Sequence, residues 1–212
     1  GSYYGIYSAV NETYISNCSL KTGSLAQSGD FRNSIHLSGA KDALIQNINA
    51  SSVKYAFSIS QSSNIILRNI NSQSSPTSLN LYNSNNISVE DVDLSQIVTG
   101  IGMSLSNNCS FKNITINTAS SYGIKIEKDS QYNKFFNMSV FNALDGIHLE
   151  TSLNNSFKDI YVKDCSNDGI SLFNGSNNTL ENVRSYSNGQ YGVSFDKCPF
   201  SIGRNISVRN NS

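Results

Sequence analysis

Two short motifs in the middle of the chain place ionisable side chains between apolar ones: IKIE at 124–127 and IHLE at 147–150. Alternate residues of an extended strand point to opposite sides, so Lys125, Glu127, His148 and Glu150 are expected to share an outer face. Two carboxylates about 5 Å apart are the arrangement of a retaining glycosidase, in which one is the nucleophile and the other the acid and base. The neighbouring Lys125 and His148 would tune the pKa values of the two glutamates. This site requires the two motifs to lie side by side.

The motifs belong to a repeat. Glycines followed by Ile or Val recur every 23 residues, at Gly100, Gly123, Gly146, Gly169 and Gly192, and toward the N-terminus the same apolar position recurs every 22. Apolar and polar residues alternate inside each repeat, which is the period of a strand and not of a helix. Two or three short strands per repeat, joined by polar turns, describe one coil of a solenoid.

The repeat predicts an all-β fold, a right-handed parallel β-helix (solenoid) of about nine coils with 22–23 residues per coil. Coils would stack at about 4.8 Å, which makes Glu127 and Glu150 neighbours in one column. We expect one β-helix domain over residues 1–212, with a longer first coil at 1–33 and eight regular coils at 34–212.

A polar column recurs beside the second strand signal of each repeat. Its members are Asn47, Asn69, Asp91, Asn113, Asn137, Asp159, Asn182 and Asn205. Stacked amides at a corner of the coil can hydrogen-bond to one another and to the turn backbone. The column is therefore predicted to form an asparagine ladder.

The repeat grammar GIxL…N-N-x-[FL]-x-[ND]-[IV]-x-[VA] resembles the right-handed parallel β-helix repeats of the pectate-lyase-like superfamily. It is most similar to the copper-site-assembly and carbohydrate-binding (NosD/CASH-type) arrays of extracellular archaeal and bacterial proteins. The resemblance covers essentially the whole chain and implies the fold. It does not imply one function, because the fold hosts lyases, hydrolases, adhesins and shell proteins.

Several features weigh against catalysis. The coils are short and even, without the long loop insertions that build a cleft in the enzymes of this fold. The outward positions of other coils are mostly small and uncharged: Ser58, Asn80, Ser104, Ser171 and Ser194. The two histidines are far apart and no Cys-x-x-Cys occurs, so no metal site and no cofactor is expected. These features predict a protein that is not an enzyme, with Glu127 and Glu150 as the only catalytic candidates.

Composition limits the partners. The formal net charge is zero and 14% of residues are charged, which argues against nucleic acid and anionic membranes. No apolar run is long enough to span a bilayer. Twelve N-x-S/T sequons indicate an exported, extracellular or cell-surface chain, with the turn sites Asn154, Asn174 and Asn177 as the glycosylation candidates. The repeated N-[IM]-[ST] pattern of the ladder also produces sequons without any need for glycosylation, so both explanations of the sequons stay open. Glycans remain candidate partners.

Four cysteines divide into two kinds. Cys18 and Cys109 fall at apolar strand positions, where a thiol packs as a small hydrophobe. Cys165 and Cys198 fall in turns, where a disulfide between molecules, or one within the chain, remains open.

The strand grammar runs to both ends of the sequence, and NISVRNNS at the end nearly continues into GSYYGIYS at the start. A head-to-tail contact of this kind propagates into a filament or ring. We therefore expect a structural, self-assembling subunit of a surface layer, sheath or filament whose main partner is itself. A fragment of a longer array, a carbohydrate-active enzyme and a passive glycan-binding module are the alternatives.

Overall fold

The computed structural model describes residues 4–21, 33–51 and 55–212. Part of the longer first coil, residues 22–32, lies outside the described residues. The strands are β1 (Tyr4–Ser8), β2 (Tyr14–Lys21), β3 (Asn33–Ser38), β4 (Lys41–Ser51), β5 (Tyr55–Ser60), β6 (Ser63–Gln73), β7 (Thr77–Tyr82), β8 (Asn85–Ser104), β9 (Ser110–Glu127), β10 (Lys134–Glu150), β11 (Ser156–Lys163), β12 (Ile170–Phe173), β13 (Thr179–Tyr186), β14 (Val193–Asp196) and β15 (Ile202–Arg209). No helix forms in the described part of the chain, so no helix there could cross a membrane.

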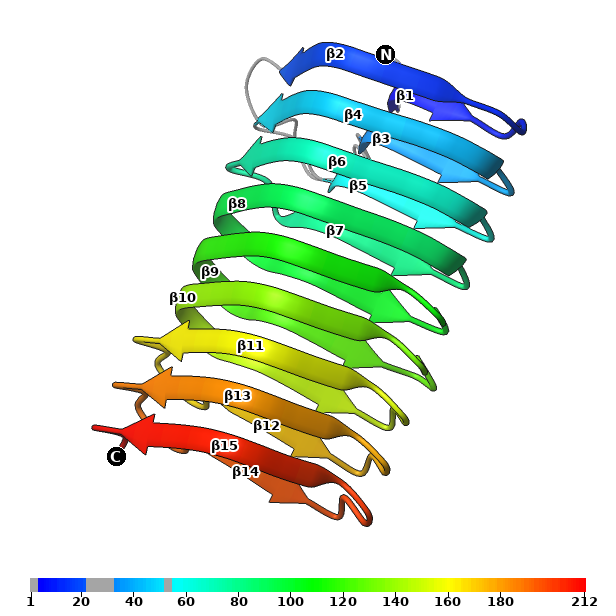
Figure 1. Cartoon of the computed structure of the whole chain (residues 1–212). Coiled ribbons are helices and arrows are strands. Elements are labelled where there is room, and N and C mark those ends of the chain that lie inside the picture. The colour runs from blue at the N-terminus through cyan, green and yellow to red at the C-terminus, as the bar shows by residue number, and fades with distance from the viewer. Residues whose placement is uncertain (1–3, 22–32, 52–54) are drawn as a thin grey trace.

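All strand pairs are parallel, and they form two long stacks (Figure 1). The ladder stack contains β2, β4, β6, the N-terminal parts of β8, β9 and β10, then β11, β13 and β15. The glycine stack contains β1, β3, β5, β7, the C-terminal parts of β8, β9 and β10, then β12 and β14. Each coil contributes one segment to each stack. The predicted all-β, parallel β-solenoid fold is confirmed.

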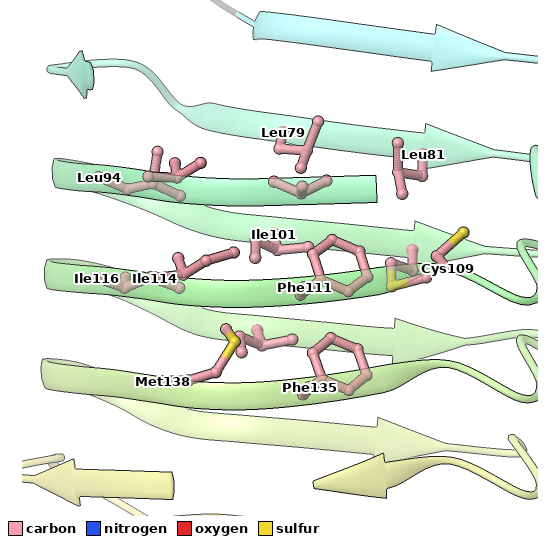
Figure 2. Packing of buried hydrophobic residues seen from close by; sticks show 14 of the residues in the cluster. Leu79, Leu81, Leu94, Ile101, Cys109, Phe111, Ile114, Ile116, Phe135 and Met138 are labelled. Atoms are coloured by element: carbon pink, nitrogen blue, oxygen red, sulfur yellow. The ribbon is translucent and has the colours of Figure 1, made fainter. Parts of the chain in front are cut away.

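Like residues stack on like residues inside the solenoid. Phe135 pairs in register with Phe111 on one side and Phe157 on the other. The ring centroids are 4.7 Å and 4.6 Å apart, and the stacked rings are nearly parallel, with interplanar angles of 3° and 6°. Figure 2 shows this aromatic column beside columns of Leu and Ile side chains that fill the rest of the interior. Burial of these apolar columns supplies the main stabilisation of the coils.

The recurring glycines are explained by close packing between coils. A Cβ on Gly146 would collide with the carbonyl oxygen of Gly169 and with the side chain of Val162, and Gly123 is in the same position relative to Gly146 and Val140. Glycine at such a position can also serve to relieve strain in a turn with positive φ. The described backbone instead shows a positive φ at only one glycine, Gly39, so the coil spacing is what requires glycine at the repeat positions.

The predicted ladder residues lie at a corner on the outside of the coils. They adopt positive φ, for example 55° at Asn47 and 57° at Asp159, a region that Asn and Asp tolerate better than other side chains. Each asparagine of the predicted ladder donates its side-chain amide to the residue one coil earlier, as from Asn69 to Asn47 at 2.6 Å and from Asn47 to Asn17 at 2.8 Å. Ionised Asp91 and Asp159 cannot donate, so the hydrogen-bonded series restarts at each of them.

A second, buried ladder directly precedes β10, β11 and β13, and it was not predicted from the sequence. Asn133, Asn155 and Asn178 are at most 1% exposed. Asn155 Oδ1 accepts from both the backbone N and Nδ2 of Asn133, each at 3.0 Å, while Asn155 Nδ2 donates to the backbone oxygen of Ser130 at 3.0 Å. In the next coil, Asn178 Oδ1 accepts from the backbone N of Asn155 at 2.9 Å, and Asn178 Nδ2 donates to the backbone oxygen of Ser152 at 3.0 Å. These amides satisfy turn groups that water cannot reach.

We predict that Asn155→Ala lowers the free energy of unfolding by about 2–4 kcal/mol, because it leaves the Asn133 donors and the Ser130 carbonyl buried without partners. Asn71→Ala, at an exposed strand position, is the matched control and should change stability by less than about 0.5 kcal/mol. Urea unfolding followed by circular dichroism measures both. Equal effects of the two substitutions would show that the buried ladder does not stabilise the coils.

Candidate functional site

The four ionisable residues of the two motifs do share one outer face. Ile124, Ile126, Ile147 and Leu149 are fully buried. The residues between them therefore face solvent on the glycine stack, with Lys125 of β9 paired to His148 of β10 across one coil step. Glu127 and Glu150 end these strands on adjacent coils.

The strongest contact on this face is an ion pair within one strand. Lys125 Nζ lies 2.6 Å from Glu127 Oε2, and Lys128 Nζ lies 3.6 Å from Glu127 Oε1. Burial disfavours ionisation of Glu127, but the hydrogen bonds and charges of Lys125 and Lys128 outweigh it and hold the pKa of this carboxyl below its ordinary value. The hydrogen bond to Glu127 in turn raises the pKa of Lys125. Both groups are thus charged over the neutral pH range.

A tyrosine that the sequence analysis did not assign to this site completes it. The ring of Tyr122 lies 5.2 Å from the imidazole ring of His148, at an angle of 41°. Lys125 Nζ lies 5.3 Å from the centre of the Tyr122 ring. On the other side, His148 Nε2 is 3.9 Å from Glu150 Oε2. We call Tyr122, Lys125, Glu127, His148 and Glu150 the proton-transfer cluster, because it joins a phenol, an imidazole, an ammonium and two carboxylates.

A shallow depression of about 170 Å³ adjoins the cluster on the side of the preceding coils. Gly102 occupies the outward column between Asn80 and Lys125, and the missing side chain leaves this space open. Thr77, Thr99, Lys125 and Glu127 also line it. An extended polar ligand can therefore lie along the glycine stack and reach both the depression and the cluster.

The second histidine is not part of this site. His36 lies in the same outward column, several coils away on β3, and its ring stacks on Tyr7 at 5.6 Å and 22°. Burial lowers the pKa of His36. In the described residues, no group of three or more His, Cys, Asp or Glu side chains is placed to hold a metal ion.

A family profile described as a right-handed beta helix region matches residues 99–212, which is more than half of the chain. The chain belongs to the right-handed β-helix family. This assignment confirms the resemblance in the repeat grammar. A search of curated proteins finds no match to this β-helix.

Solved structures share the fold at low sequence identity. The Azotobacter vinelandii mannuronan C-5 epimerase AlgE6 A-module is 11% identical, with 99% of this chain and 71% of that chain covered and a TM-score of 0.80. The periplasmic alginate epimerase AlgG is 13% identical over 96% of this chain and 69% of that chain, with a TM-score of 0.74. The enzymatically active domain of bacteriophage CBA120 tailspike protein 2 is 12% identical over 83% and 36%, with a TM-score of 0.60.

These matches overturn the expectation of a self-assembling structural subunit. The solved β-helices that share the fold are named as epimerases or as an enzymatically active domain. The prediction that the chain is not an enzyme is wrong for the same reason. The expectation rested on the short, even coils, which do not prevent ionisable side chains from gathering on a sheet face. Here an ionisable cluster instead forms on a plain sheet face, from two adjacent coils.

Of the two turn cysteines, Cys165 is more deeply buried than its predicted turn position suggests. Cys165 is only 3% exposed, and its backbone N–H donates to Asn188 Oδ1 at 3.0 Å inside the coil. It therefore cannot form the disulfide between molecules that its turn position suggested. Cys198 is partly exposed, and both thiols are free. The glycosylation candidates Asn154, Asn174 and Asn177 lie between strands with positive φ, and their use stays a prediction.

We predict that iodoacetamide at pH 8 alkylates Cys198 in the folded protein and leaves Cys165 unmodified. Burial raises the pKa of the Cys165 thiol to about 11, so little thiolate forms at that pH, and the sulfur is also inaccessible. Cys109, whose pKa burial also raises to about 11, is the matched buried control. Mass spectrometry with and without urea measures the labelling. Equal labelling of Cys165 and Cys198 without urea would contradict the buried position.

Proposed function

We propose that this protein is an exported, carbohydrate-active β-helix that transfers a proton at C-5 of uronate units in an acidic polysaccharide. The observation that carries the proposal is the convergence of Tyr122, His148 and Lys125 on the outer face of the glycine stack. The names of the structural relatives, mannuronan C-5 epimerase and alginate epimerase, support this substrate class.

The chemistry of such a reaction requires three groups. The C-5 hydrogen of a uronate is adjacent to the carboxylate, so a cation that neutralises the carboxylate makes the proton easier to remove. A base then takes the proton from one side of the ring, and an acid returns a proton to the other side. An imidazole and a phenol in contact, beside an ammonium group, supply all three functions.

Each residue of the proton-transfer cluster has a role in this proposal. Lys125 neutralises the substrate carboxylate, and its three donors allow it to do so while it keeps its bond to Glu127. His148 removes the C-5 proton and Tyr122, in contact with His148, returns a proton to the same carbon. Glu127 fixes the position of Lys125, and Glu150, 3.9 Å from His148 Nε2, stabilises the imidazolium that forms.

The ionisation of Glu127 excludes this residue as the acid of a retaining glycosidase. That mechanism needs one carboxylic acid whose pKa is raised so that it can protonate the leaving oxygen. The pKa of Glu127 is instead held low by Lys125 and Lys128. Proton transfer by His148 and Tyr122 does not need a protonated glutamate.

Two features support an exported location. AlgG is described as periplasmic, and the tailspike domain belongs to a bacteriophage particle. The abundance of sequons in this chain and its low charge agree with such a setting.

We predict that the protein exchanges the C-5 hydrogen of mannuronan for deuterium in D₂O, measured by ¹H NMR of the polymer. His148→Gln and Tyr122→Phe should each slow the exchange by at least about 100-fold, since each removes an acid–base group. Lys125→Met should raise KM as well as lower kcat, because it removes the carboxylate contact. His36→Gln, in the same column but several coils away, is the control and should keep wild-type exchange.

Two results would contradict the proposal. One is wild-type exchange in the His148→Gln protein. The other is release of new reducing ends without C-5 exchange, abolished by Glu150→Gln, which would assign the cluster to glycoside hydrolysis.

A further inference from the structure

We propose that the ladder stack carries a second, separate binding groove for an acidic oligosaccharide. A groove of about 580 Å³ lies along the outer corner of the last coils. Its floor is formed by Asn137, Asp159, Asn182 and Asn205 of the outer ladder, and Tyr161 and Arg184 rise beside them. The proton-transfer cluster lies on the other stack, so the two sites occupy different sides of the coil (Figure 1).

Tyr161 is the aromatic side chain that lines this groove, and two aromatic neighbours outside the lining hold its ring in place. The ring of Tyr161 meets Phe141 edge-on at 5.5 Å and 80°, and Tyr186 at 5.9 Å and 75°. The hydroxyl groups of Tyr186 and Ser207 are 3.1 Å apart and hydrogen-bonded. Because the Tyr161 ring is fixed before a ligand arrives, little side-chain entropy is lost when the apolar face of a sugar ring packs on it.

Arg184 supplies the charge that selects an acidic ligand. Neighbouring lysines are already engaged, Lys158 with Glu181 at 2.9 Å and Lys163 with Asp164 at 3.1 Å. Arg184 is exposed and has no ion-pair partner among the described residues. A planar guanidinium presents two parallel donors to a carboxylate or sulfate group, so Arg184 is suited to a sugar that carries one.

The floor of the groove offers hydrogen-bond acceptors to sugar hydroxyls. Asp159 accepts from Asn182 Nδ2 at 2.8 Å but cannot donate to Asn137, so the ladder is interrupted inside the groove. The amide oxygen of Asn137 therefore receives no hydrogen bond from the next coil. One sugar hydroxyl group can donate to this oxygen and another to the Asp159 carboxylate, which replaces the missing ladder contact.

The same corner near the N-terminus shows that this chemistry is not a general property of the fold. There a groove of about 470 Å³ is lined by Asn and Asp residues, including Asn71, Asp91 and Asp93, and by no aromatic or cationic side chain. Asn71 occupies the column position that Tyr161 and Arg184 occupy in the later coils. Of the two grooves, only the one on the last coils has Tyr and Arg at this column position, where the N-terminal groove has Asn and Asp.

The size and charge of the groove favour a short stretch of glycan over nucleic acid. It spans the four coils from Asn137 to Asn205, about 14 Å at the spacing of parallel strands. A nucleic-acid groove needs a row of cations along the phosphates, whereas Arg184 is the only cation that lines this one, and the whole chain has zero net charge. The groove would hold the polymer whose uronate units the cluster acts on, or another acidic glycan.

The test measures binding apart from the reaction. Isothermal titration uses the Lys125→Met/His148→Gln protein, in which the cluster is disabled, and a mannuronate hexamer as the probe. We expect residual binding that weakens at least tenfold with Tyr161→Ala and at least tenfold with Arg184→Ala. Tyr14→Ala and Arg68→Ala, exposed residues of the same types outside the groove, should leave affinity unchanged. In ¹⁵N NMR spectra the hexamer should shift amide signals of β11, β13 and β15.

Each other outcome overturns the groove proposal. A neutral cellohexaose bound as tightly as the mannuronate hexamer would show that Arg184 does not favour acidic over neutral sugars. An oligothymidylate bound more tightly than either would favour nucleic acid. No residual binding in the disabled protein, with wild-type binding intact, would leave the cluster as the only glycan site. Because the groove is tested by binding in a protein with a disabled cluster, absence of C-5 exchange in the wild type would not by itself affect this result.

Discussion

Backbone hydrogen bonds between parallel coils are the constraint on which the rest of this structure depends. They fix the register, so that residue n on one coil always lies against the residue about 23 positions away on the next, as with Phe135 and Phe157. Every position thereby becomes a column, and each column must hold side chains that tolerate close contact with their own kind. Phenylalanine rings stack, amides donate to amides, and glycine lets one coil approach the next.

The same constraint shapes both candidate sites. Charged residues of one sign repel one another when they repeat in a column, which agrees with the small, uncharged residues at most outward positions of the glycine stack. The cluster at Lys125 and His148 is an exception because each carboxylate has a partner in its own strand, Lys125 for Glu127 and His148 for Glu150. These contacts within a strand allow two glutamates to occupy adjacent coils.

The fold could be predicted from the sequence because the constraint leaves a direct trace there. The spacing of 22–23 residues, the alternation inside each motif and the Asn column need no knowledge of distant contacts. The inward or outward direction of Lys125 and Glu127 followed from the same alternation. What could not be predicted depends on the turns. Asn133 and Asn155 look like ordinary turn residues, and only the path of the backbone shows that their side chains point inward.

The groove along the outer ladder could not be predicted from the sequence for a related reason. A residue with positive φ, such as Asp159, resets the strand alternation, so that Tyr161 faces the concave side of the corner and not the flat face of the glycine stack. The function was misjudged because repeat regularity describes how coils stack and not what one coil pair does. Tyr122 belongs to the cluster only because its ring leans across one coil step onto His148.

The ion pair of Lys125 with Glu127 sets a limit on how the cluster can work. A lysine held at 2.6 Å by a carboxylate is fixed in position, but part of its charge is already offset. A substrate carboxylate then gains less from Lys125 than from an isolated ammonium group, because Glu127 repels it at the same time. The balance favours binding only where further contacts hold the polymer in place. The depression at Gly102 can supply them beside the cluster, and a separate groove on the ladder stack would raise the local concentration of the same chain.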